Sequence, residues 1–162
     1  RWIFFDLADP AKRTREDIAK AVDLIAKFQK HAKVILGLNL QEGRQIGEVL
    51  GLAPCEETHE AVAARAAWIR EKLGVETVVI HPVSFAAAAD AKGTAAVQGP
   101  FIEKPMITTG AGDHFNAGFC IGRILGAPLD VSLQIGVATS GFYVRTAKSP
   151  TAEDMVSFLR TL

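Results

Sequence analysis

Apolar residues recur along the chain with two periods, which separate predicted strands from predicted helices. Short apolar runs rich in β-branched and aromatic residues are typical of buried strands, and they occupy residues 2–7, 33–40 and 77–81. Ile18, Val22 and Ile25 follow a helical spacing that predicts an amphipathic helix over residues 15–31. Further helices are expected over residues 42–50 and 60–73. Strands that alternate with helices predict βαβ units and a parallel sheet.

The second half of the sequence has a different pattern. Two short runs, residues 84–89 and 93–97, predict a hairpin, and an irregular stretch with two prolines follows. Helical spacing resumes after Phe115, and two more helices are expected to begin near Asp130 and Thr151. The pattern as a whole predicts one α/β domain over residues 1–162, with three layers in the order α/β/α and a mainly parallel sheet.

Composition narrows the function classes. The 162 residues are 49% apolar and 22% charged, and 18 basic residues balance 18 acidic ones. No charge argument therefore favours nucleic acid or an acidic membrane as a partner. No apolar run is long enough to span a bilayer. Cys55 and Cys120 are far apart and lack CxxC spacing, so we expect two buried thiols in a reducing compartment, the cytoplasm.

The stretch Thr108-Thr109-Gly110-Ala111-Gly112-Asp113-His114-Phe115 carries the candidate chemistry. Glycines allow a tight turn and a close approach of the backbone to a ligand. The helix that begins there offers free N–H groups and a favourable dipole to an anion. A carboxylate inside such an anion site suits a base that deprotonates an attacking hydroxyl, which predicts phosphoryl transfer. A plain turn with Asp113 as helix N-cap is the alternative.

The longer string T-T-G-A-G-D-x-F-N-A-G-F resembles the C-terminal signature of the ribokinase/PfkB family of carbohydrate kinases. The resemblance implies a Rossmann-like ribokinase fold with antiparallel edge strands, and ATP as the phosphoryl donor. It implies that Asp113 is the catalytic base, that Gly110, Ala111 and Gly112 form the anion hole, and that Thr109 contacts the nucleotide. Ile107 stands where the family has an Asp that helps to hold a monovalent cation, which puts cation activation in question.

Asn39 and Glu42 follow the second predicted strand, where α/β proteins gather their ligands. An amide and a carboxylate suit Mg²⁺, which keeps several waters, although N-x-x-E alone also fits a surface loop. The resemblance supports magnesium, because N-x-x-E is a family motif at this place. Asn39 and Glu42 are therefore predicted to organise Mg²⁺ and the nucleotide phosphates.

The sequence departs from the family after the third predicted strand. The family has T-x-G-x-x-G there, and His81, Val83 and Ala86 occupy the matching positions. His81 and Ser84 remain as candidate nucleotide contacts, although a strand-end histidine is the simpler interpretation of His81. Gly136 and Ser140 lie in the stretch that borders the adenine in the family, and Ala147 replaces a family glycine. These departures argue against ordinary ATP affinity.

The resemblance covers only the C-terminal half of a family member, and the chain begins without methionine inside an apolar run. We therefore expect a fragment without the N-terminal sugar-binding part and the lid, through which a homodimer could form. Asp9 and Arg13 weakly match a family D-x-N-x-R segment, and a solvated loop fits them equally well.

The predicted function is ATP-dependent phosphoryl transfer to a hydroxyl of a sugar or sugar-like alcohol. Two alternatives stay open: a kinase-like ligand-binding or regulatory protein without turnover, and a nucleoside or vitamin kinase of the same fold. The isolated fragment is expected to be inactive under any of these three hypotheses. Neither nucleic acid nor a membrane is an expected partner.

Overall fold

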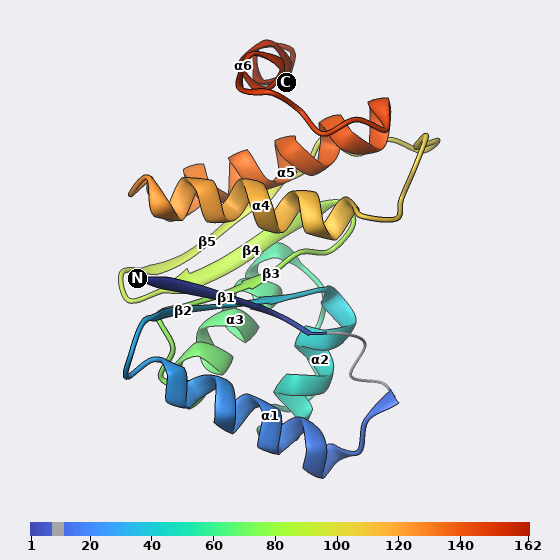
Figure 1. Ribbon diagram of the computed structural model, residues 1–162. Helices are drawn as coiled ribbons and strands as arrows, with labels where there is room; N and C mark the ends of the chain where they lie inside the picture. The colour runs from blue at the N-terminus through green and yellow to red at the C-terminus, as the bar shows by residue number, and fades with distance from the viewer. Residues whose placement is uncertain (8–11) are drawn as a thin grey trace. The chain divides into compact units, whose positions relative to one another are not determined.

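The computed structural model describes residues 1–7 and 12–162, so the predicted role of Asp9 lies outside the described residues. The chain forms two compact units, which we describe separately (Figure 1). The first contains Arg1–Pro82 and Ala87–Ala96, and the second contains Val83–Ala86 and Val97–Leu162. No helix among the described residues is both long and apolar enough to cross a bilayer.

A five-stranded mixed sheet organises the first unit. Its strands follow one another in chain order: β1 (Trp2–Asp6), β2 (Lys33–Leu38), β3 (Thr77–Ile80), β4 (Phe85–Asp90) and β5 (Gly93–Gln98). The pairs β1–β2 and β2–β3 are parallel, whereas β3 and β4 are antiparallel. The predicted parallel strands and the antiparallel pairing near the sheet edge are therefore confirmed, with boundaries that differ by one or two residues.

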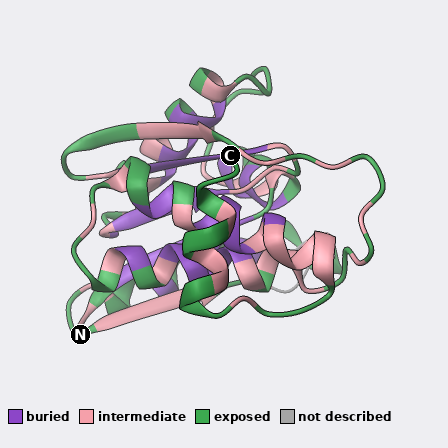
Figure 2. Ribbon diagram, turned by 90° about the horizontal axis from the view of Figure 1, so that it is seen from above, coloured by how far each residue is buried: buried purple, intermediate pink, exposed green. Residues whose placement is uncertain are grey.

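The burial of the strands explains their sequences. In β2, every residue after Lys33 is buried, because parallel strands are covered on both faces. In β1, Trp2–Phe5 are only half-buried, as the strand beside the N label shows in Figure 2. β1 is also the end strand of the sheet order, so one of its two edges has no strand partner among the described residues.

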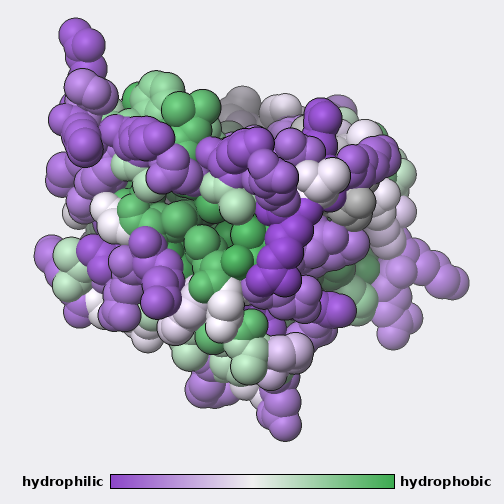
Figure 3. Space-filling view, turned by 90° about the horizontal axis from the view of Figure 1, so that it is seen from below, coloured by the Kyte–Doolittle hydropathy of each residue, from purple (hydrophilic) through white to green (hydrophobic). Residues whose placement is uncertain are grey.

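Three helices of the first unit lie together on one side of its sheet (Figure 1). They are α1 (Arg15–Phe28), α2 (Leu40–Val49) and α3 (His59–Leu73). α1 buries Ile18, Val22 and Ile25, as its helical spacing predicts. Its solvent-facing side carries two ion pairs between residues four apart, Lys20–Glu16 and Lys27–Asp23, each at 2.7 Å. Figure 3 shows hydrophilic side chains around an apolar area on the face seen from below.

The second unit contains α4 (Ala111–Ile124), α5 (Leu129–Thr146) and α6 (Ala152–Leu159). α4 and α5 lie side by side, and small residues allow their close approach (Figure 1). A Cβ added at Gly122 would lie 2.8 Å from Ser132 Cα, and one added at Gly136 would lie 2.8 Å from the ring of Phe115. These glycines therefore serve helix packing, which requires a residue without a side chain at the contact.

The C-terminal end of α5 has a backbone conformation that a substitution can test. Ala147 caps α5 in the left-handed conformation, with φ of 55°, which costs an L-residue roughly 1–2 kcal/mol. We expect Ala147→Gly to raise the free energy of unfolding by about 1 kcal/mol in urea denaturation. Ala117→Gly is the matched control, because Ala117 is exposed inside α4 and glycine there should destabilise by about 1 kcal/mol. Destabilisation by both substitutions would contradict the left-handed conformation of Ala147 at the end of α5.

Candidate active site

The predicted helix start is present and has the geometry that its glycine predicts. Gly110 caps α4 with φ of 87°, a left-handed conformation that favours glycine. Asp113 lies in the first turn of α4, and its side chain is exposed to solvent. The alternative of Asp113 as N-cap is wrong, because Gly110 is the N-cap residue and no side chain caps this helix. An exposed carboxylate therefore lies at the positive end of a helix dipole.

The backbone N–H groups of this turn divide into free and occupied donors. The N–H of Ala111 donates to the carbonyl oxygen of Thr108 at 3.1 Å. The N–H groups of Gly110, Gly112 and Asp113 have no acceptor within the described part of the chain. The three free donors therefore differ from the predicted set of Gly110, Ala111 and Gly112: the Ala111 amide is engaged, and the Asp113 amide is available instead.

Side chains from two other segments hold the turn in place. The hydroxyl of Tyr143 in α5 donates to the carbonyl oxygen of Thr109 at 3.0 Å. His114 Nδ1 lies 2.7 Å from the carbonyl oxygen of Gly110, and His114 Nε2 lies 2.9 Å from Ser149 Oγ. The rings of His114 and Tyr143 are stacked, with centroids 3.6 Å apart and planes at 11°. Because a carbonyl only accepts, Nδ1 carries the proton in this arrangement.

These contacts fix the direction of a free amide. The C=O of Thr109 and the N–H of Gly110 belong to one planar trans peptide and point in opposite directions. The hydrogen bond from Tyr143 holds that carbonyl oxygen, so it also holds the N–H of Gly110 pointing away from α5. The direction of the Gly110 N–H is thus fixed by contacts within the second unit.

In the first unit, Asn39 and Glu42 form a capping box at the start of α2. Asn39 Oδ1 accepts from the N–H of Glu42 at 2.9 Å, and Glu42 Oε2 accepts from the N–H of Asn39 at 2.8 Å. Glu42 is 5% exposed. This box starts α2 at Leu40, two residues before the predicted start, and it gives N-x-x-E a structural role.

The donor set at this helix start fits magnesium only in part. An amide and a carboxylate are hard oxygen ligands of the type that Mg²⁺ accepts. One side-chain oxygen of each residue already accepts a hydrogen bond from a backbone N–H. This favours contact with Mg²⁺ through water over direct ligation. The structure forms no cluster of three or more His, Cys, Asp or Glu side chains that could hold a metal ion within residues 1–7 and 12–162.

The remaining predicted contacts lie in both units. His81 follows β3 in the first unit, and its N–H donates to the carbonyl oxygen of Leu38 at 2.9 Å. Ser84 belongs to the second unit, where its carbonyl oxygen accepts from the N–H of Gly99 at 2.8 Å. Gly136 and Ser140 lie on α5, where Gly136 is buried against Phe115 and Ser140 is half-buried.

The structure thus gathers part of the predicted site in each unit. Thr109–Asp113 form one turn in the second unit, which also holds Ser84, Gly136 and Ser140, whereas Asn39, Glu42 and His81 belong to the first unit. Sequence reasoning missed Tyr143 and Ser149. His114 lies four residues after Gly110, and this spacing is a local sequence signal for its contact with the Gly110 carbonyl oxygen. Tyr143 lies too far along the chain from Thr109 for any such signal.

Comparison with solved structures shows the fold class. The ribokinase of Thermotoga maritima superposes with a TM-score of 0.67 at 21% identity, covering 97% of this chain and 48% of that protein. A putative ribokinase II of E. coli, solved in complex with ATP and Mg²⁺, superposes with a TM-score of 0.62 at 23% identity, covering 93% and 47%. The fold is therefore the α/β/α fold of ribokinase-like kinases, as predicted.

Sequence comparison then gives the family. The family model for prokaryotic ketohexokinase matches residues 1–162, so the chain belongs to this family. A ketohexokinase of Haloferax volcanii is 30% identical over 156 residues, which are 96% of this chain and 40% of that protein. The chain thus spans less than half the length of this curated relative. The predicted membership among ribokinase-related carbohydrate kinases is confirmed.

Proposed function

We propose that the full-length protein is an ATP-dependent kinase that phosphorylates a hydroxyl of a ketohexose or a closely related sugar. One observation carries the proposal: an exposed carboxylate, Asp113, shares a helix start with three free backbone N–H groups. Family membership and the name of the haloarchaeal relative support the acceptor class. The E. coli protein bound to ATP and Mg²⁺ has the same fold and supports the donor.

In the proposed reaction, Asp113 accepts the proton of the sugar hydroxyl. The hydroxyl oxygen bonds to the γ-phosphorus of ATP as the bond between that phosphorus and the bridging oxygen breaks, which releases ADP. The N–H groups of Gly110, Gly112 and Asp113 stabilise negative charge on the transferring group. Ala111 can join them only if its N–H leaves the carbonyl oxygen of Thr108. Thr109, which precedes Gly110, would contact the nucleotide.

The nucleotide and metal contacts are further proposals. Bound magnesium would neutralise phosphate charge and orient the phosphates. Asn39 and Glu42 would hold its waters at the start of α2. His81 and Ser84 would approach the phosphates, and Gly136 and Ser140 would border the adenine. The residues that choose the sugar would belong to the part of the relatives that this chain does not cover, and so would a lid that pairs two subunits.

The hydrogen bond from Tyr143 to Thr109 predicts a specific kinetic effect when it is removed. Tyr143→Phe removes the hydrogen bond to Thr109 but keeps the ring that stacks on His114. We expect kcat of the full-length enzyme to fall about tenfold with little change in the KM of the sugar, because direct loss of one such donor costs about 10²–10³. Steady-state kinetics at saturating Mg-ATP measure both constants.

Thr146→Val is the matched control for this change. Thr146 Oγ1 on the same helix also donates to a backbone carbonyl oxygen, that of Phe142 at 3.0 Å. A fall in kcat of similar size in both variants would show a general effect on α5. An unchanged kcat in Tyr143→Phe would show that the hydrogen bond from Tyr143 to Thr109 does not contribute to turnover.

A substrate panel tests the proposed acceptor. Full-length protein with Mg-ATP is offered fructose, ribose and adenosine, and ADP release is measured. Preferred turnover of fructose supports the proposal, whereas preference for adenosine supports the nucleoside kinase. Absence of turnover on any acceptor, with Mg-ATP binding still detected by calorimetry, supports the regulatory alternative, which the lost glycines at Val83, Ala86 and Ala147 motivate.

A further inference from the structure

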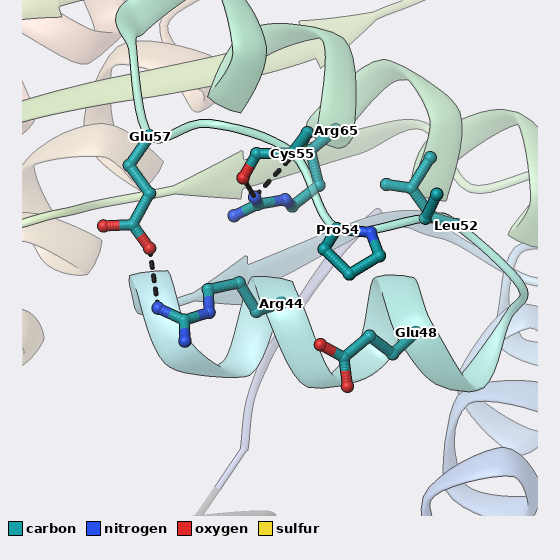
Figure 4. Close-up of a pocket in the computed structure, with 8 residues that line it drawn as sticks. Arg44, Glu48, Leu52, Pro54, Cys55, Glu57 and Arg65 are labelled. Atoms are coloured by element: carbon teal, nitrogen blue, oxygen red, sulfur yellow. Dashed lines mark hydrogen bonds and ion pairs between the residues drawn. The ribbon is translucent and has the colours of Figure 1, made fainter.

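A cavity of about 430 Å³ lies in the first unit, between α2, α3 and the linker that joins them (Figure 4). Its volume falls within the usual range for small-molecule sites. None of the residues assigned above to the candidate active site lines it. The residues that line it are Arg44, Glu48, Leu52, Ala53, Pro54, Cys55, Glu57 and Arg65.

Arg65 is the unusual member of this wall. It is 3% exposed, so its guanidinium is held away from solvent. Nη2 donates to Cys55 Sγ at 3.0 Å and to Cys55 O at 3.4 Å, while Nη1 is buried without a hydrogen-bond partner among the described residues. No carboxylate in the described chain forms an ion pair with Arg65.

A buried cation with only neutral partners is costly. Removing a guanidinium from water is strongly unfavourable unless a negative charge compensates for it. Sulfur is a weak acceptor, and a contact of 3.4 Å is at the long limit for a hydrogen bond. An oxyanion in the cavity would replace these weak acceptors with charge-assisted hydrogen bonds, which are about twice as strong.

The rim of the cavity supplies a second cation. Arg44 Nη1 pairs with Glu57 Oε1 at 2.7 Å, and both side chains are well exposed, at 54% and 43%. Exposed ion pairs of this kind contribute little to stability, so exchanging Glu57 for a ligand costs little. Figure 4 shows Arg65 and Cys55 turned toward each other, and Arg44 and Glu57 joined by their ion pair.

We propose that this cavity is a binding site for a small molecule that carries a carboxylate or phosphate group. Arg65 holds the anionic group from inside, and Arg44 holds it from the rim. The carboxylate of Glu48 accepts a hydrogen bond from a hydroxyl or amine of the same ligand. Leu52 and Pro54 contact its carbon skeleton.

The two cysteines of the chain provide the readout. Cys55 is exposed, although the sequence predicts a buried thiol, and it contacts Arg65. An occupied cavity therefore shields its thiol. Cys120 is an internal reference, because burial raises the pKa of its thiol to about 11, which keeps it protonated and slow to react near pH 8. Full-length protein is treated with iodoacetamide, with inorganic phosphate or malonate added, and both cysteines are quantified by peptide mass spectrometry.

At a probe concentration of about ten times Kd, labelling of Cys55 should slow about tenfold, and that of Cys120 should not change. Protection by phosphate alone assigns a phosphate ligand, and protection by malonate alone assigns a carboxylate. Arg44→Gln and Arg65→Gln should each lose the protection, whereas Arg70→Gln, which changes an arginine of α3 outside the cavity, should keep it.

The exposed Arg44 keeps the test decisive if Arg65→Gln fails to fold. Absence of protection by both probes would overturn the proposal and leave a water-filled cavity with a structural arginine. Protection that persists in Arg44→Gln would also overturn it, because the anion would then bind elsewhere. These outcomes do not depend on kinase activity, so they are independent of the proposed function.

Discussion

Replacing Asp113 by Asn should lower the turnover of the full-length enzyme at least about a hundredfold, because the amide cannot accept the proton of the attacking hydroxyl. The change keeps the size of the side chain and leaves the exposed first turn of α4 in place. Binding of Mg-ATP should survive, since removing the negative charge weakens no contact to an anion. Initial rates of ADP release, with calorimetry of nucleotide binding, separate the two effects.

Asp130→Asn is the matched control. Asp130 is also exposed and also lies in the first turn of a helix, α5. Both variants lose the same favourable charge from a helix start, which is worth about 0.3–1 kcal/mol of stability. Equal activity of the Asp113 and Asp130 variants would remove Asp113 from the chemistry.

Gly110→Ala should be the second most damaging change. At φ of 87° the added Cβ is strained by roughly 1–2 kcal/mol, and it would lie 3.2 Å from the hydroxyl of Tyr143. That contact disturbs the bond from Tyr143 to Thr109, so the N–H of Gly110 loses its direction. We expect turnover to fall at least about a hundredfold, comparable to the loss of one anion-hole donor.

Gly126→Ala separates backbone strain from disruption of the site. Gly126 has a similar φ of 76°, and a Cβ added there meets nothing within 4 Å. Thermal unfolding should show a comparable loss of stability in both variants, while turnover should fall only in Gly110→Ala. Loss of turnover in both would mean that stability alone explains the defect.

The strands of this protein could be predicted from its sequence because parallel strands are continuously apolar. The runs at β2 and β3 are rich in apolar, β-branched residues and are buried, so little competes with the strand assignment. The start of α2 was predicted two residues late. The pattern N-x-x-E predicts a metal site at Asn39 and Glu42. In the structure these two residues also form the reciprocal hydrogen bonds of a capping box, which begins α2 at Leu40.

The candidate site was only partly predictable, for a physical reason. Gly110 and Asp113 lie within one turn, where local sequence dictates conformation. The contact from Tyr143 depends on how α5 packs against α4, and the engagement of Ala111 by Thr108 depends on the exact path of the turn. Tertiary packing decides such contacts, and a single sequence carries no signal for them.

The activity that we propose for the full-length protein is transfer of the γ-phosphoryl group of ATP to a sugar hydroxyl. The most direct measurement is ³¹P NMR of the full-length protein with Mg-ATP and fructose. ADP and a sugar phosphate monoester should form in equal amounts. Release of inorganic phosphate without a sugar phosphate, or unchanged ATP, would contradict it.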